Sequence, residues 1–169
     1  MAVFHDVTND ASGAFDDFYR GTSRRLVRFA LGLTGNTGDA QDIVQEAYVR
    51  AWQRWSKVGD YESAEAWLRV VVHRLATDRW RRLAVRRLFA AKAPAPGVVP
   101  PPSEDALHIM AALRTLPPAQ RRAVALHYLL DLSIEQIAEE TGAPTGTVKS
   151  WLSRGRITMA EALGGERDA

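Results

Sequence analysis

Residues 133–157 read SIEQIAEETGAPTGTVKSWLSRGRI, and this stretch decides the fold of the C-terminal part of the chain. Ser133 followed three residues later by Gln136 is a capping box, a common start of a helix. Gly142 adopts positive φ without strain and suits the end of that helix. Thr145 is then the predicted N-cap of a second helix. The stretch therefore predicts two short helices joined by a tight turn, a helix-turn-helix.

The apolar residues of these two helices lie on one face of each, so we expect the helices to pack against each other. They are Ile134, Ile137 and Ala138 on the first helix and Val148, Trp151 and Leu152 on the second. The outer face of the second helix carries short polar and basic side chains, which suit contacts with phosphates and base edges. We expect DNA contacts from Thr147, Lys149, Ser150, Ser153 and Arg154. The alternative is a helical hairpin with a solvated face, which the lack of acidic residues on this face makes less favoured.

A proline-rich stretch lies upstream of this unit. Residues 90–103, AAKAPAPGVVPPPS, contain five of the eight prolines in the chain. Proline removes backbone donors and favours extended neighbours, so no packed helix is expected to cross this stretch. It is typical of a semi-stiff linker. We predict a linker over residues 89–104 that joins a module of residues 14–88 to a module of residues 105–163.

Both modules show helical patterns. In the first, an apolar stripe with i, i+1, i+4, i+5 spacing follows the predicted N-cap Asp39. The stripe consists of Ile43, Val44, Ala47, Tyr48, Ala51, Trp52 and Trp55. Further helices are predicted over residues 14–33, from near Ser63, over residues 107–116 and from Pro118. Since no alternating β pattern occurs, we predict an all-α fold of two small helical modules.

The positive charge of the chain is concentrated in one segment. The chain as a whole carries a net charge of +2, but residues 68–92 contain eight basic residues and one acidic residue. Trp80 lies among these arginines. Charge that neutralises phosphates beside a ring that stacks on bases favours a nucleic-acid partner, with a solvated charged face as the alternative. A second polar face carries Asp42, Gln45, Glu46 and Arg50, and by itself it indicates only solvation and a Glu46–Arg50 pair.

Several function classes are not favoured by the composition. The chain has no cysteine, and its four histidines are scattered without a metal-binding or catalytic motif. The N-terminal residues do not resemble a signal peptide, and no apolar stretch reaches the ~20 residues that cross a bilayer. We therefore expect a cytoplasmic protein that is not an enzyme, has no catalytic residue, metal or cofactor, and does not insert into membranes.

Three stretches together resemble the extracytoplasmic-function (ECF) sigma factors of bacterial RNA polymerase. They are GDAQDIVQEAYVRAW at 38–52, AWLRVVVHRLATDRWRR at 66–82 and LPPAQRRAVALHYLLDLSIEQIAEETGAPTGTVKSWLSRGR at 116–156. The resemblance covers roughly residues 14–163 in the right order. It is interrupted only by the linker.

The resemblance implies a role for each surface. The first module resembles sigma region 2, and its residues Asp42, Gln45 and Glu46 match the surface that docks on the clamp helices of core RNA polymerase. Residues 57–65 correspond to a loop that captures a flipped base of the −10 element. Flipping a base out of the stack costs a few kcal/mol. The implied −10 contacts are Tyr61, Arg74, Arg79, Trp80, Arg81 and Arg82. The second module resembles region 4, which places the five outer residues of the helix-turn-helix over the −35 element.

Two positions depart from the family pattern, which usually has asparagine at Arg74 and commonly arginine at Trp151. Many members are held inactive by an anti-sigma factor, which is thus a further candidate partner beside polymerase and promoter DNA. The alternative function is a free-standing helix-turn-helix regulator that binds DNA without delivering polymerase.

Overall fold

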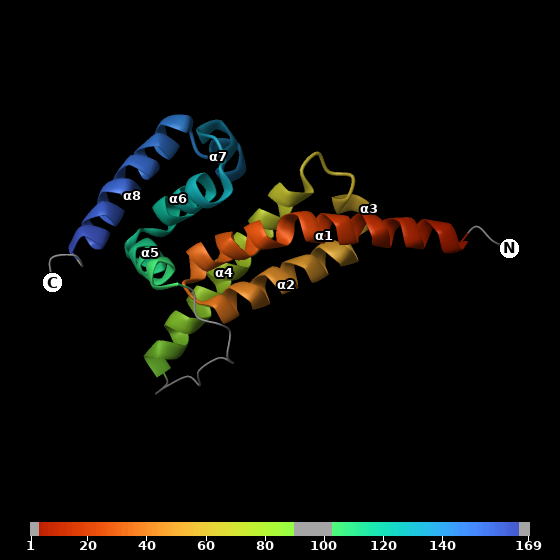
Figure 1. The fold of residues 1–169 in the computed structure, drawn as a ribbon, viewed down its shortest axis with the longest axis horizontal. Coiled ribbons are helices and arrows are strands. Elements are labelled where there is room, and N and C mark those ends of the chain that lie inside the picture. Colours follow the sequence, from red (N-terminus) through yellow and green to blue (C-terminus); the bar gives the residue numbers. More distant parts are fainter. Residues whose placement is uncertain (1–3, 90–102, 166–169) are drawn as a thin grey trace.

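The computed structural model describes residues 4–89 and 103–165, and every regular element within these two ranges is a helix (Figure 1). The first range holds α1 (Phe4–Thr34), α2 (Thr37–Gln53), α3 (Trp55–Val58) and α4 (Ala64–Phe89). The second holds α5 (Glu104–Thr115), α6 (Pro118–Leu130), α7 (Ile134–Thr141) and α8 (Thr145–Gly165). The prediction of an all-α fold with two helical modules is confirmed. The predicted linker, apart from its ends, lies outside the described residues.

The start of α2 differs from the prediction. Asn36, not Asp39, is the N-cap: its backbone is extended, and its side-chain oxygen accepts a hydrogen bond from the Asp39 N–H at 2.9 Å. Gly35 has a φ of 67°, which turns the chain out of α1 and places Asn36 at the cap position. Asp39 lies in the first turn, where its negative charge faces the positive end of the helix. Helix α1 also begins ten residues before the predicted start at residue 14.

The core of the first module lies between α1, α2 and α4. Leu26 and Phe29 of α1 are fully buried against the apolar stripe of α2. One polar contact crosses this core, a 2.6 Å hydrogen bond between the hydroxyl groups of Thr22 and Tyr48. Burial raises the pKa of Tyr48 to about 12. The hydroxyl group therefore stays neutral and hydrogen-bonded, as a buried polar group requires.

The helix-turn-helix forms as its sequence predicts. Ser133 Oγ accepts from the Gln136 N–H at 3.1 Å, and the Gln136 side chain accepts from the Ser133 N–H at 2.9 Å. Gly142 ends α7 with a φ of 72°, and Val148 is fully buried between the two helices. Helix α8 already begins at Thr145, so the predicted N-cap is wrong by one position.

The two modules pack against each other, which the linker did not lead us to expect. The C-terminal half of α1 contacts α2 and α4 on one side and α5 and α6 on the other (Figure 1). At Gly32 the helices approach so closely that a Cβ atom would lie 2.8 Å from Leu129 Cδ1. Buried residues of both modules thus form one continuous hydrophobic cluster.

Arg121 of α6 joins the ends of two helices. Its guanidinium group donates to the carbonyl oxygens of Leu113 at 3.0 Å, Arg114 at 2.9 Å and Leu116 at 3.0 Å, all at the end of α5. A longer bond of 3.4 Å reaches the carbonyl oxygen of Leu33 near the end of α1. These bonds satisfy carbonyls that a helix leaves without internal partners.

His73 of α4 lies at the contact between the modules. Burial lowers its pKa to about 4, and the positive charges of Arg122 and Arg74 act in the same direction. Burial also lowers the pKa of Arg122, whose charge the nearby Glu140 favours and Arg74 opposes. The neutral imidazole is therefore the form that fits among these cations.

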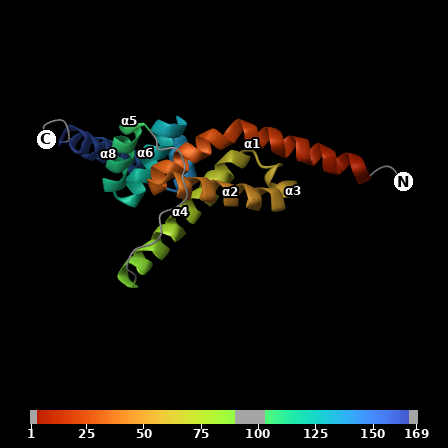
Figure 2. The ribbon, with the colours of Figure 1, turned by 60° about the horizontal axis from the view of Figure 1, so that its bottom comes forward.

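The C-terminal end of α4 extends beyond the other helices, as both views of the ribbon show (Figures 1 and 2). Trp80 is 62% exposed there, and Val85 and Leu88 are exposed as well. Trp80 is thus a surface residue and does not belong to the hydrophobic core.

The first prediction concerns the cap of α7. Ser133→Ala should lower the free energy of unfolding by ~1 kcal/mol, because it removes the acceptor for the Gln136 N–H. Urea unfolding monitored by circular dichroism measures this loss. Ser153→Ala on the exposed face of α8 is the matched control. Equal losses in the two variants would contradict the role of the cap.

The second prediction concerns His73. Its pKa of about 4 in the folded chain lies below the ordinary 6.5, so the unfolded chain takes up a proton first as the pH falls. The stability that this residue contributes is therefore present above pH 6.5 and is lost toward pH 4. His73→Gln should lose less stability over this range than the wild type, as urea unfolding at several pH values would measure. Parallel losses in the two proteins would count against this role.

Candidate polymerase and nucleic-acid interface

Three polar residues of α2 share one exposed face. Asp42, Gln45 and Glu46 follow at the i, i+3, i+4 spacing of neighbours on a helix surface, and all three are exposed. Glu46 forms the predicted ion pair with Arg50, with a separation of 2.6 Å. The face therefore offers carboxylate and amide groups to a partner from a rigid helix.

Arg79 connects this face with the basic helix α4. Its guanidinium group lies 2.5 Å from Asp39 Oδ1 and 3.8 Å from Asp42 Oδ2. The side chain thus packs toward α2, whereas Arg81 and Arg82 are exposed to solvent. Among the residues predicted for −10 contacts, Arg79 therefore already has acidic partners within the chain.

Arg74 lines a groove, and Tyr61 directly precedes two residues that line the same groove. Tyr61 is 47% exposed in the turn between α3 and α4, next to Glu62 and Ser63, which line the groove. Arg74 is exposed on α4 and lines the groove as well. Ser63 begins α4 with a 3.1 Å hydrogen bond from the Ala66 N–H to its hydroxyl group. The loop and α4 thus both line this groove, and Trp80 and its neighbouring arginines lie farther along α4.

The outer face of α8 carries the side chains predicted for it. Lys149, Ser153 and Arg154 are exposed, while Thr147 and Ser150 are partly buried. Trp151 packs against the hydrophobic core of the module rather than projecting into solvent. The basic face is therefore present, but it lacks a side chain at this position that could reach a phosphate group.

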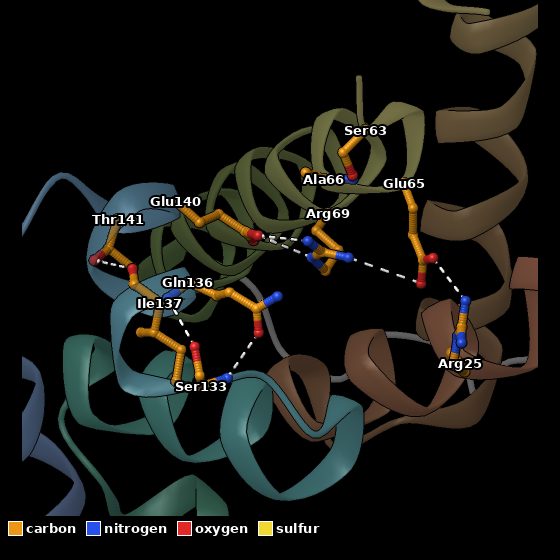
Figure 3. A network of polar contacts seen from close by, with 10 residues as sticks. All are labelled: Arg25, Ser63, Glu65, Ala66, Arg69, Ser133, Gln136, Ile137, Glu140 and Thr141. Atoms are coloured by element: carbon orange, nitrogen blue, oxygen red, sulfur yellow. Dashed lines mark hydrogen bonds and ion pairs between the residues drawn. The ribbon is translucent and has the colours of Figure 1, made fainter. Parts of the chain in front are cut away.

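A chain of alternating charges links the two modules (Figure 3). Arg25 of α1 lies 2.6 Å from Glu65 of α4, and Glu65 lies 3.7 Å from Arg69 one turn later. Arg69 in turn contacts Glu140 of α7, at 2.8 Å between Nη2 and Oε2 and 2.9 Å between Nε and the same oxygen. Sequence reasoning missed this contact, because 71 positions separate its two residues and no local spacing relates them.

The described ranges contain neither a membrane-spanning helix nor a metal-binding cluster. No helix there is long and apolar enough to span a membrane. No cluster of His, Asp and Glu side chains among the same residues could hold a metal ion.

Comparison with known families and structures identifies both modules. Residues 18–86 match Sigma-70 region 2, and residues 107–159 match Sigma-70 region 4. The RNA polymerase sigma-E factor of Streptomyces avermitilis is 32% identical over 151 residues, which cover 88% of this chain and 84% of that protein. The ECF RNA polymerase sigma factor SigL of Mycobacterium tuberculosis is 35% identical over 147 residues, covering 80% and 83%.

The fold is also found among solved structures. The sigma factor RpoE of Bartonella quintana, crystallised in complex with the anti-sigma factor NepR, is similar with a TM-score of 0.66 and 26% identity. The match covers 88% of this chain and 97% of that one. The sequence relatives and the two matched regions together show that the chain belongs to the ECF family of RNA polymerase sigma factors.

Proposed function

We propose that this sigma factor holds core RNA polymerase with its first module and contacts promoter DNA at two points, one on each module. The observation that carries the proposal is the presence of a region 2 match and a region 4 match in one chain, at residues 18–86 and 107–159. As an alternative sigma factor, the chain directs promoter-specific transcription. The proposed division assigns residues 14–88 to docking and −10 contact, 89–104 to a linker and 105–163 to −35 contact.

We assign the polymerase contact to Asp42, Gln45 and Glu46 of α2. Their exposure on one helix face and the acidic character of two of them support a partner surface that donates hydrogen bonds or carries positive charge. The clamp helices of core polymerase are the proposed partner.

We assign the −10 contact to α4 and the loop before it. Arg74, Arg81 and Arg82 are exposed and would neutralise phosphates, and the exposed Trp80 would stack on a base. Tyr61 would line a pocket for a flipped base. Arg79, held by Asp39 and near Asp42, would join the −10 surface to the polymerase-docking face.

We assign the −35 contact to α8, the second helix of the helix-turn-helix. Such a helix enters the major groove with its N-terminal residues toward the base edges. Lys149 and Arg154 are exposed there and would contact phosphates or guanines. Thr147, Ser150 and Ser153 supply short donors and acceptors beside them.

The proposal assigns no catalytic step to the chain itself. Polymerase forms the phosphodiester bond, and the sigma factor contributes binding energy and position, without a cofactor, in the cytoplasm. An anti-sigma factor is a further proposed partner, since the similar RpoE of Bartonella quintana was crystallised with one. A free-standing regulator is not favoured, because the region 2 match would then have no role.

Run-off transcription tests the function. The full chain is added to bacterial core polymerase with fragmented genomic DNA of the source organism, and we expect discrete start sites that core polymerase alone does not produce. Binding of duplex DNA without any discrete start on any template would instead favour the regulator.

The third prediction addresses docking. Asp42→Arg should weaken the affinity for core polymerase roughly 100-fold, because a misplaced charge at an interface costs several kcal/mol. Run-off transcripts should fall with the affinity, which fluorescence anisotropy of labelled protein measures. The control is Glu161→Arg, a charge reversal on the exposed face of α8. Wild-type affinity in the Asp42 variant would refute the assignment.

The fourth prediction addresses the −35 contact. Lys149→Ala should weaken promoter binding by the sigma–polymerase complex and reduce the slope of log affinity against log salt by ~1, because one phosphate contact is lost. Titrations of a promoter fragment at several salt concentrations give this slope. Arg20→Ala, at an exposed position of α1, should leave the slope unchanged. A wild-type slope in the Lys149 variant would show that this lysine contacts no phosphate.

A further inference from the structure

The C-terminal part of α4 extends beyond the hydrophobic core. Ala76 is the last residue of α4 in the hydrophobic cluster, and none of the described side chains in the segment that follows, residues 77–89, is buried. This projecting segment (Figure 2) carries three residues proposed for −10 contact, Trp80, Arg81 and Arg82. A helix end without buried apolar contacts is free to move, so apolar packing does not fix the direction of these three side chains.

One polar contact ties the projecting segment to α2. Arg79 Nη2 lies 2.5 Å from Asp39 Oδ1 and 3.8 Å from Asp42 Oδ2. Among the described side chains, no other ion pair or hydrogen bond joins residues 77–89 to a neighbouring helix. A hydrogen bond between two charged groups is short and strong, so this one limits how far the segment can swing away from α2.

The two acids at the start of α2 differ in what they can contact. The Asp39 side chain is 16% exposed, whereas that of Asp42 is 69% exposed. Asp39 is also fixed in position, because its N–H donates to the Asn36 side chain in the first turn of α2. Arg79 thus has a partner that is shielded from solvent, while Asp42 remains available to core polymerase. The carboxylate that was expected to cap α2 is used instead by a residue of α4.

The contact also sets the rotation of α4 about its own axis. Successive residues of a helix lie ~100° apart around the axis. With Arg79 turned toward α2, Trp80 lies ~100° and Arg81 ~200° around the helix, so Arg81 faces away from α2. Two carboxylates near Arg79 moreover balance its charge, which leaves little positive charge to attract a phosphate group.

We propose that Arg79 is a positioning residue rather than a DNA contact, and that Asp39 is its fixed partner. Together they hold the projecting segment so that its exposed tryptophan and two following arginines meet the −10 strand at a set angle to the docking face of α2. The inference rests on the proposed −10 role of α4, but the effect of the contact on the segment is testable without DNA.

The direction of the projecting segment is measured by electron spin resonance. Because the chain contains no cysteine, Gln53→Cys and Val85→Cys introduce two unique label sites, at exposed positions of α2 and of the segment. We expect a narrow distribution of distances between the two labels in the otherwise unchanged full chain. Asp39→Ala and Arg79→Ala should each broaden it, because each removes the ionic contact. Arg86→Ala, the loss of an exposed arginine on the same segment, is the matched control and should leave it narrow.

A charge exchange separates the contact from general damage to the fold. Asp39→Arg alone should broaden the distribution, because it places two like charges against each other. The double variant Asp39→Arg, Arg79→Asp should make it narrow again, since the pair is rebuilt with the charges exchanged. A merely destabilising effect of the single change would not be reversed by the second.

The role toward DNA is measured with a promoter fragment found by run-off transcription. With Arg79→Ala, the sigma–polymerase complex should bind it roughly 5-fold more weakly, as expected if the segment has the competent direction about a fifth of the time. The slope of log affinity against log salt should keep its wild-type value, because no phosphate contact is lost. Arg82→Ala should instead reduce this slope by ~1. Asp39→Ala should weaken binding as Arg79→Ala does, although it removes a negative charge.

Three results would overturn the inference. The first is a wild-type label distribution as broad as that of Arg79→Ala. The second is a salt slope reduced by ~1 in Arg79→Ala, which would make this arginine a phosphate contact. The third is tighter promoter binding in Asp39→Ala. Failure of the proposed function would look different, because the labels would respond as expected while no variant and no wild type directed a discrete start with core polymerase.

Discussion

The burial of the C-terminal half of α1 on two sides is the constraint on which the rest of the structure depends. Leu26 and Phe29 are fully buried in the core of the first module, and three residues later Gly32 meets Leu129 of the second. A helix that is covered on both sides positions α2 and α4 on one flank and α5 and α6 on the other. The polar faces of α2, α4 and α8 are left outside. The surfaces proposed to contact polymerase and DNA are therefore the polar helix faces that the packing around α1 leaves exposed.

Local and periodic features of the fold could be predicted from the sequence. The capping box of Ser133 and Gln136, the turn at Gly142 and the buried Val148 depend on neighbours within one or two helical turns, so their signals are local. The prediction of Asp39 as the cap of α2 is wrong, and Asn36 is the cap instead, although both residue types suit an N-cap. The positive φ of Gly35 decides between them, and only the structure provides it.

Contacts between distant polar residues could not be predicted in this way. Arg69 stands in a helix with arginines on every side, and Glu140 in one with three other acidic or amide residues, so neither is distinguished by type or spacing. The same holds for Arg79, which the family pattern assigns to DNA and the structure also places beside Asp39. The approach of two modules at Gly32 leaves no periodic signal either. The sequence predicts site residues by type and position, but it does not show which charged groups surround each of them.

Arg121 shows how narrowly one position can be specified by geometry. Its planar group has five N–H donors in a fixed fork and serves four carbonyl oxygens at the ends of α5 and α1. A lysine there would keep the charge, but its three donors radiate from one nitrogen and could not follow this spread of acceptors. An exchange of arginine for lysine, which protein surfaces tolerate readily, is thus a severe change at this position. A change at this one position therefore removes hydrogen bonds from the ends of helices that belong to different modules.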